Sequence, residues 1–264
     1  MTTYTHGHAD SVLRSHRWRT ADNSAAYLLP HLRPGLDLLD VGCGPGTITA
    51  DLAVRVAPGK VIAIDAAEAP LAEARAAAAA AGVEVDVRLG DVYAIDLPDD
   101  SVDVVHAHQV LQHLTDPVAA LREMARVCRP GGLVAARDGD YAGMFWSPAS
   151  PQLDRWQSIY RATARANNAE PDAGRHLLGW AHAAGFTDVT ASAGTWCFAT
   201  AEDRRWWGGL WADRTTSSAY AEQAVALGLT DRAELLDVGA AFRQWSDDPD
   251  GWFVVVNSEI LCRV

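Results

Sequence analysis

Three glycines stand within five residues in the segment LLDVGCGPGTIT, Leu38 to Thr49. They follow an apolar run and an acid, a pattern typical of a tight turn between a buried strand and a helix. A turn with so few side chains lets the backbone approach a ligand closely. The spacing is G-x-G-x-G, whereas a dinucleotide site has G-x-G-x-x-G, and Pro45 removes a backbone N–H donor. We therefore expect a bound ligand that lacks a diphosphate.

Polar side chains recur where later apolar segments end. Asp65 ends the segment KVIAID, Asp91 ends an alternating segment, and His108 ends SVDVVHAH. If these segments are parallel strands of one sheet, their carboxyl ends meet at the edge where such sheets bind ligands. We therefore expect the glycine turn, Asp65, Asp91 and His108 to line one crevice.

The segments that must position these residues alternate between strand and helix patterns. Strands are expected at 36–42, 60–65, 83–91, 101–108 and 133–140, and helices at 47–57, 70–82 and 116–132. Such alternation implies right-handed crossovers and a parallel sheet with helices on both faces. Two later strands, 187–200 and 251–264, would complete a seven-strand, mostly parallel, doubly wound α/β sheet of the Rossmann-like type.

The chain changes character after residue 140. Nine of the ten tryptophans lie beyond that point. Residues 150–168 read as an extra helix, and about fifty mostly helical residues separate the last two strands, far more than a hairpin loop needs. Tryptophan can hold an apolar or cationic ligand, or it can form the core of the extra helices themselves. Both interpretations stay open.

At this point a family resemblance can be stated. In the order and spacing of its motifs, the chain resembles the class I S-adenosylmethionine (SAM)-dependent methyltransferases. The motifs are LLDVGCGPGTIT, Asp65, GDV at 90–92, and SVDVVHAHQVLQHLTDP followed by EMARVCRPGG. More narrowly, they resemble the ubiquinone/menaquinone-biosynthesis C-methyltransferase-like group. The resemblance covers residues 36–140 well and the rest of the chain weakly. It implies SAM as cofactor and a small-molecule methyl acceptor.

The resemblance also implies cofactor contacts in the glycine turn and after the second strand. Gly42, Cys43 and Gly44 would face the amino acid and ribose parts of SAM. Asp65 would accept hydrogen bonds from the ribose hydroxyls, a charge-assisted arrangement, and Ala66 follows it in the same site.

Further contacts would come from the third and fourth strands. Asp91 would accept from the adenine amino group, and Val92 would offer its backbone N–H to the ring. His108 and Gln109, at the end of the fourth strand, complete the implied cofactor set.

Relatives of this family close the cofactor pocket with a segment that precedes the first strand. Tyr4 and Arg19 are the aromatic and basic residues that we expect on the methionine carboxylate. An ordinary helix packed on the sheet is the alternative for this segment.

The resemblance implies a single domain, 1–264, with three functional parts. Residues 1–35 would form a helical cover and residues 36–140 the SAM-binding core. Residues 141–170 and 201–250 would be insertions that form a lid over the acceptor.

Histidines supply the candidate catalytic groups. A general base is needed only when the acceptor must lose a proton, and histidine titrates near neutrality. His108 and His113 follow the fourth strand, and His6, His8 and His16 could reach the site from the N-terminal segment. We favour His113, with the absence of any base as the alternative.

The loop after the fourth strand bears on the acceptor. It reads HAHQVL, without the N/D-P-P-Y/F tetrapeptide of amino-group methyltransferases that act on adenine or glutamine. This disfavours those amino-group acceptors, and other nitrogen acceptors stay open. We expect methylation at carbon or oxygen, in secondary or quinone-type metabolism.

Composition limits the other partners. The net charge of -12 argues against a nucleic-acid footprint, and no apolar run is long enough to span a membrane. No signal peptide is evident, so we expect a cytoplasmic protein. No metal-ligand cluster stands out, and the four cysteines are far apart, which favours buried reduced thiols.

Two rival functions remain at this stage. A nicotinamide-dependent oxidoreductase is disfavoured by the glycine spacing. A non-catalytic SAM-binding protein is compatible with every motif described above.

Overall fold

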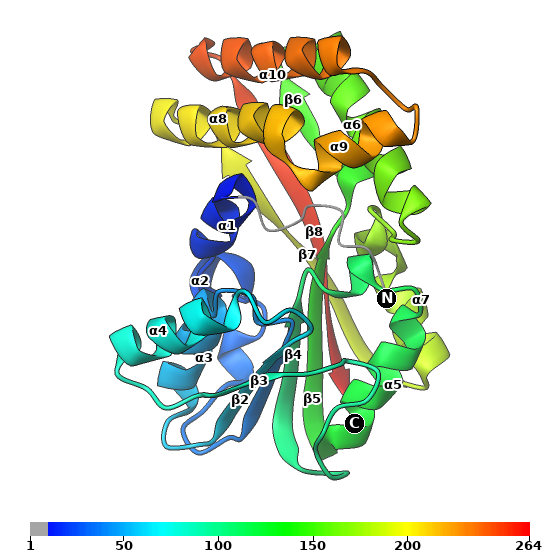
Figure 1. The fold of residues 1–264 in the computed structure, drawn as a ribbon. Helices are drawn as coiled ribbons and strands as arrows, with labels where there is room; N and C mark the ends of the chain where they lie inside the picture. The colour runs from blue at the N-terminus through cyan, green and yellow to red at the C-terminus, as the bar shows by residue number, and fades with distance from the viewer. Residues whose placement is uncertain (1–9) are drawn as a thin grey trace.

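The computed structural model describes residues 10–264, whose eight strands form one sheet with helices on both faces (Figure 1). The strand order is β3-β2-β1-β4-β5-β8-β6, and β7 pairs with the free edge of β8. The strands are β1 (Leu38–Val41), β2 (Val61–Asp65), β3 (Asp86–Leu89), β4 (Val102–His108), β5 (Cys128–Gly139), β6 (Phe145–Ser147), β7 (Asp188–Phe198) and β8 (Trp252–Arg263). Tyr4, His6 and His8 lie outside the described residues.

The first five strands run parallel, and β8 runs antiparallel to each of its neighbours. The predicted Rossmann-like α/β sheet is therefore confirmed. The short strand β6 was not predicted. It pairs with Trp252–Val254 of β8, beyond the stretch Asn257–Arg263 that pairs with β5. Because the register pairs β5 only with Asn257–Arg263, the first residues of β8 extend beyond β5 and are open to a further strand.

Ten α-helices surround this sheet in the described part of the chain. They are α1 (Asp10–Arg17), α2 (Ala21–Ser24), α3 (Thr47–Val56), α4 (Leu71–Ala81), α5 (Pro117–Val127), α6 (Pro151–Ala166), α7 (Leu177–Ala184), α8 (Ala201–Ser217), α9 (Ala219–Ala226) and α10 (Arg232–Asp247). Figure 1 shows α3 and α4 on one side of the sheet and α5 and α7 on the other. The helices α6, α8, α9 and α10 lie together beyond the carboxyl ends of the parallel strands, and we call them the helical cap.

Local signals set the helix boundaries. Asp116 caps α5, because its carboxylate accepts from the N–H of Ala119 at 2.9 Å, and Pro117 occupies the first turn. Gly82 ends α4 in the left-handed conformation, with φ +69°. The predicted helix 116–132 is too long. It ends at Val127, because Cys128 already pairs with Val102 in the sheet.

Two kinds of hydrophobic core share the long strands β7 and β8. The core beneath the parallel strands is mostly aliphatic, and Leu39, Val105, Leu121 and Val134 are fully buried in it. The core of the helical cap is aromatic, and Trp156 lies at its centre.

Two further expectations can be compared with the structure. Among residues 10–264, no helix is long and apolar enough to cross a membrane. All four cysteines are free. Cys128 and Cys262 are buried as expected, whereas Cys43 is only partly buried. Cys197 departs from the expectation, because it is exposed on β7, where the indole N–H of Trp252 donates to its sulfur at 2.8 Å.

Candidate active site

A cavity of about 990 Å³ opens at the carboxyl ends of the parallel strands and extends to the helical cap. One end is lined by the glycine turn, Asp65–Ala67 and Asp91–Tyr93. The other end is lined by Tyr141, Met144, Trp196, Trp206, Trp207, Trp211 and Arg214. His108, the last residue of β4, also lines it, as do Gln109, Gln112 and His113 in the segment that follows. The glycine turn, Asp65, Asp91 and His108 thus share one cavity.

The three glycines of the turn serve different purposes. A Cβ at Gly42 would overlap the Val110 side chain, and a Cβ at Gly46 would lie 2.6 Å from the Cα of Ala74. These two glycines therefore allow close packing within the protein. A Cβ at Gly44 would meet no atom within 4 Å, although this residue lines the cavity with φ +54°. Of the three glycines, only Gly44 lacks a protein neighbour at its Cβ position, so only there can the missing side chain leave room for a ligand.

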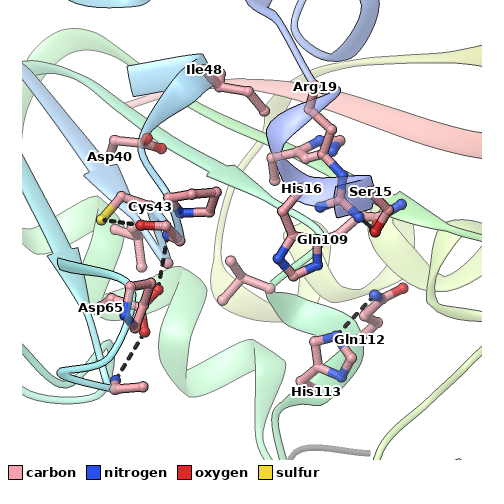
Figure 2. A pocket seen from close by; sticks show the side chains of 18 of the residues that line it. Ser15, His16, Arg19, Asp40, Cys43, Ile48, Asp65, Gln109, Gln112 and His113 are labelled. Atoms are coloured by element: carbon pink, nitrogen blue, oxygen red, sulfur yellow. Dashed lines mark hydrogen bonds between the residues drawn. The ribbon is translucent and has the colours of Figure 1, made fainter. Parts of the chain in front are cut away.

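Asp65 holds the glycine turn in place. Its Oδ2 accepts from the N–H of Gly44 and its Oδ1 from the N–H of Ala67, both at 2.9 Å (Figure 2). Each carboxylate oxygen can accept more than one hydrogen bond, so a ligand hydroxyl can still be bound. Cys43, beside it, is a poor nucleophile because burial strongly raises the pKa of its thiol.

The loop after β3 contributes an exposed acid. Asp91 accepts the N–H of Tyr93 at 2.9 Å through Oδ1, and its carboxylate remains open to solvent at the mouth of the cavity. Val92 is buried behind it. This arrangement leaves a carboxylate and a small apolar surface facing the same end of the cavity.

Gln109 joins the N-terminal segment to the sheet. Its Oε1 accepts from Arg19 Nη2 at 2.8 Å, and its Nε2 donates to Asn257 Oδ1 at 3.1 Å. The Arg19 guanidinium also lies 5.4 Å from the ring centre of Trp196, a cation–π arrangement. Gln109 has φ +54°, a left-handed conformation that costs energy for a residue with a Cβ. Neither the chain of amides nor this strained backbone was evident from the sequence.

Helix α1 crosses the cavity between its two ends. Ser15 and His16 line the cavity from this helix. Arg17 donates to both carboxylate oxygens of Glu73 in α4, at 2.8 and 2.9 Å. On the other side, Arg14 donates to Asp213 in α8 at 2.7 Å. The helix is therefore tied both to the parallel-sheet half and to the helical cap (Figure 1).

A row of buried polar side chains crosses the sheet beneath the cavity, and we call it the polar row. It consists of Asp40, His106, His108, Arg137 and Glu259, which the pairings of β1, β4, β5 and β8 bring to one face. The exposed Ser192 of β7 follows at its end and donates to Glu259 at 2.7 Å. His106 Nδ1 lies 2.8 Å from Asp40 Oδ1, and Arg137 Nε donates to Glu259 at 3.1 Å. The alternation in HAH was the only sequence signal of this row.

The environments of the two candidate catalytic histidines differ. Burial lowers the pKa of His108 well below its usual value, and the charges of Arg19 and Arg137 add to this effect. Within residues 10–264, neither ring nitrogen of His108 has a hydrogen-bond partner. Burial, with the Arg19 charge, lowers the pKa of His113 to about 4. Both rings are therefore neutral at pH 7.

His113 is held by its neighbour in the chain. Its Nε2 lies 3.0 Å from Nε2 of Gln112, and Figure 2 shows the pair on the side of the cavity opposite Asp65. Both residues belong to the short 3-10 helix Leu111–His113. The Gln112 backbone is fixed by Asp138, whose Oδ1 accepts its N–H at 3.0 Å.

Some tryptophans form only the core of the helical cap, and others also face the cavity. Trp156 and Trp245 are buried in the cap core and do not line the cavity. Trp207 and Trp211 belong to that core and also line the cavity. The Arg214 guanidinium stacks 4.9 Å from the ring centre of Trp211. One aromatic cluster therefore builds the cap and faces the cavity.

Comparison with known proteins identifies the family. Residues 39–136 match the methyltransferase domain. An uncharacterised methyltransferase of Schizosaccharomyces pombe is 34% identical over 98% of this chain and 96% of its own length. This chain belongs to the class I SAM-dependent methyltransferases. Its cofactor is SAM, and the nicotinamide alternative is set aside.

Other relatives are similar over shorter stretches or in fold only. The nocamycin O-methyltransferase of Saccharothrix syringae is 43% identical to this methyltransferase over 47% of the chain and 42% of its own length. The crystal structure of the YcgJ protein from Bacillus subtilis superposes with a TM-score of 0.58 at 19% identity, covering 90% of this chain and 97% of that one. This likeness supports the Rossmann-like fold.

The cavity fits the cofactor on structural grounds. SAM carries ribose hydroxyls, an adenine amine and an amino acid group, and the cavity offers Asp65, Asp91 and the open face of Gly44 at one end. Within residues 10–264, no group of three or more His, Cys, Asp or Glu side chains could hold a metal ion.

Proposed function

We propose that this methyltransferase methylates a small, largely apolar or aromatic molecule at oxygen or carbon. One observation carries the proposal: a single cavity joins a cofactor end, rich in carboxylates, to an aromatic end. Its volume of about 990 Å³ lies at the upper limit of small-molecule sites, which span roughly 300–1,000 Å³. Such a volume accommodates a cofactor together with a second small ligand.

At the cofactor end, we assign the contacts by position. Asp65 and Ala66 would hold the ribose, Asp91 and Val92 the adenine, and the turn at Gly44 the amino acid part. Gly42 and Cys43 shape this turn.

Where the turn meets β4, His108, Gln109 and Arg19 would complete the cofactor end. Tyr4, which lies outside the described residues, remains part of the proposed set.

At the acceptor end, the protein supplies position and a dry environment. Bound SAM supplies an electrophilic methyl group on a sulfonium. Trp196, Trp206 and Trp207 would hold a flat molecule, while α1 and the helical cap keep water out. Placing the two reactants in contact removes much of the entropic cost of the reaction. The likeness to an enzyme named for O-methylation supports oxygen as the acceptor atom.

Two measurements test this function. Calorimetric titration with S-adenosylhomocysteine, with NAD as the control, should show micromolar binding of the first compound only. Methylation of a panel of phenols, enols and activated C–H acids, followed by release of S-adenosylhomocysteine, then tests the acceptor class. Turnover of protein or nucleic-acid acceptors, with none of the small molecules, would contradict the proposal.

A non-catalytic role is tested by the same titrations. Retention of S-adenosylhomocysteine without turnover of any acceptor would favour that role.

A further inference from the structure

His113 and Gln112 form a side-chain pair that lines the cavity on the side opposite Asp65 (Figure 2). The atoms in contact are the Nε2 of Gln112 and the Nε2 of His113, 3.0 Å apart. A carboxamide nitrogen can only donate a hydrogen bond. His113 Nε2 must therefore accept, and in a neutral imidazole the proton then resides on Nδ1.

Gln112 cannot easily turn away from this contact. Only 3% of the residue is exposed. Its N–H donates to Asp138 Oδ1 at 3.0 Å, and its C=O accepts from the N–H of Glu170 at 2.9 Å. The Oε1 of Gln112 would lie only 3.4 Å from a Cβ at position 139, so Gly139 leaves room for the amide. These contacts fix the backbone of Gln112, and burial confines its side chain, whose Oε1 has no hydrogen-bond partner among residues 10–264.

We propose that Gln112 is a positioning residue, which holds His113 as a neutral ring with its proton on Nδ1 and so presents it to the methyl acceptor as a hydrogen-bond donor and not as a general base. This proposal rests on the proposed function for its meaning in the reaction. The tautomer itself can be measured without any acceptor.

The charges around His113 support a neutral ring. Arg19 acts on the ring from the segment before β1, and its positive charge opposes protonation. Asp138, on β5, contacts the backbone N–H of Gln112. His113 does not suit the role of general base that was expected from the sequence, because the lone pair on its Nε2 accepts a hydrogen bond from Gln112 and protonation of the ring is unfavourable.

A hydrogen-bond donor at His113 restricts the chemical class of the methyl acceptor. A donor at this place stabilises an oxygen that carries negative charge or a lone pair. The acceptor is then the anion of a phenol, enol or related acidic compound, which has lost its proton to bulk water before methyl transfer. Its oxygen receives a hydrogen bond from His113 while that oxygen, or the carbon conjugated to it, faces the methyl group.

The test is ¹⁵N NMR of histidine-labelled protein saturated with S-adenosylhomocysteine. Chemical shifts distinguish a protonated from an unprotonated ring nitrogen, so the tautomer of His113 is read directly. The wild type should show the Nδ1–H form from pH 5.5 to pH 8. The Nε2–H form, or a ring protonated at pH 6.5, would overturn the proposal.

Variants separate this role from a structural one. Gln112→Glu places an acceptor opposite Nε2, so His113 should change to the Nε2–H tautomer and its pKa should rise by more than one unit. Gln112→Met keeps the volume but removes the donor, so the two tautomers should mix. Gln244→Met, a control at an exposed glutamine of α10 that does not line the cavity, should leave His113 unchanged. If Gln112→Glu folds but moves neither the tautomer nor the pKa, the proposal is wrong.

Turnover supplies a separate readout. With an acceptor found in the panel above, Gln112→Met should lower kcat at least tenfold and change KM less than threefold. Gln112→Glu should introduce a limb between pH 6 and 8 that the wild-type profile lacks, whereas any limb from Asp138, whose pKa is raised to about 7, is common to both proteins. An altered tautomer with unchanged kcat and pH profile would refute the role in the reaction. Failure to find any acceptor would contradict the proposed function but not the tautomer.

Discussion

The parallel-sheet half and the helical cap each have a hydrophobic core, but the two cores are built from different residue types. Beneath the parallel strands, the buried side chains are mostly Val, Leu, Ile and Ala, and they come from short segments that follow each other in sequence. In the cap, the buried side chains are mostly Trp, Tyr and Phe, gathered from α6, α8, α10 and the ends of β7 and β8. Small aliphatic residues suit closely packed parallel strands, which are covered on both faces. Large aromatic residues let a few helices enclose a wide cavity.

This difference teaches where specificity can vary. The cofactor end depends on backbone geometry at a turn and on strand-end acids. The acceptor end depends on how ring planes from distant segments pack together. A substitution in the cap should therefore alter acceptor binding before it alters cofactor binding.

The largest effect should come from Trp156→Ala in the cap. Trp156 is fully buried and contacts the rings of Trp211 and Phe242 edge-on, at 4.5 and 5.2 Å between centroids. Loss of this ring should lower the free energy of unfolding by about 3–5 kcal/mol, measured in urea. Affinity for S-adenosylhomocysteine should change less than threefold in the folded variant.

A matched tryptophan serves as the control. Trp252 is 46% exposed, so Trp252→Ala should cost far less stability. If Trp156→Ala abolishes cofactor binding while the protein remains folded, the two regions do not act separately.

In the parallel-sheet half, a strong effect should appear in the pH dependence of stability. Burial raises the pKa of Asp138 to about 7, because its carboxyl group lies wholly inside the protein. Between about pH 4 and 7 the folded state retains a proton that the unfolded state has lost. Asp138 therefore destabilises the fold as pH rises through this window, by up to about 4 kcal/mol.

The variant Asp138→Asn cannot ionise, so it isolates this contribution. Its stability relative to the wild type should rise from pH 5 to pH 7 and then level off, as measured by urea unfolding at each pH. Because the histidines are the same in both proteins, their opposite pH dependence cancels in the difference. A difference that does not change with pH would contradict the raised pKa.

A third prediction concerns the cofactor end alone. Gly44→Leu should weaken binding of S-adenosylhomocysteine at least tenfold, because the new side chain enters the cavity. Gly82→Leu is the control: it has φ +69°, nothing lies within 4 Å of its Cβ position, and it does not line the cavity. Both variants should lose about 1–2 kcal/mol of stability from left-handed strain. Equal binding by the two would contradict the placement of the ligand at Gly44.

The smallest effect should come from α1, which connects the two regions. A double-mutant cycle on Arg17 and Glu73 should give a coupling energy of roughly 0.2–1 kcal/mol that decreases with salt, because the pair is exposed. The same cycle on Arg14 and Asp213 tests the contact with the cap. A coupling above about 2 kcal/mol on the cap side only would show that α1 belongs energetically to the cap.

The sequence predicted the parallel-sheet half because its signals are local. Asp65 and Asp91 stand at strand ends, and in a parallel sheet those ends meet at one edge regardless of how the remaining chain packs. Capping residues such as Asp116 and Gly82 fixed helix ends through contacts within a few residues. The helix boundary at Val127 was missed, because pairing of Cys128 with Val102 is a contact between distant segments.

The site was predicted unevenly for the same reason. The glycine turn was visible as a pattern, but the distinct purposes of Gly42 and Gly44 depend on what lies opposite each one. The chain from Arg19 through Gln109 to Asn257 joins residues that are up to 238 positions apart in sequence, and no spacing rule links them.

By itself, the sequence determined the sheet type, the edge of the sheet at which the cavity opens, and the protein family with its cofactor. These properties follow from alternation of strands and helices and from residues at strand ends, which are local. Only the tertiary structure decided which tryptophans face the cavity, that a polar row lies beneath it, and that Gln112 contacts His113 through the donor side of its amide. Burial and hydrogen-bond direction depend on neighbours from distant segments, so they appear only when the chain is folded.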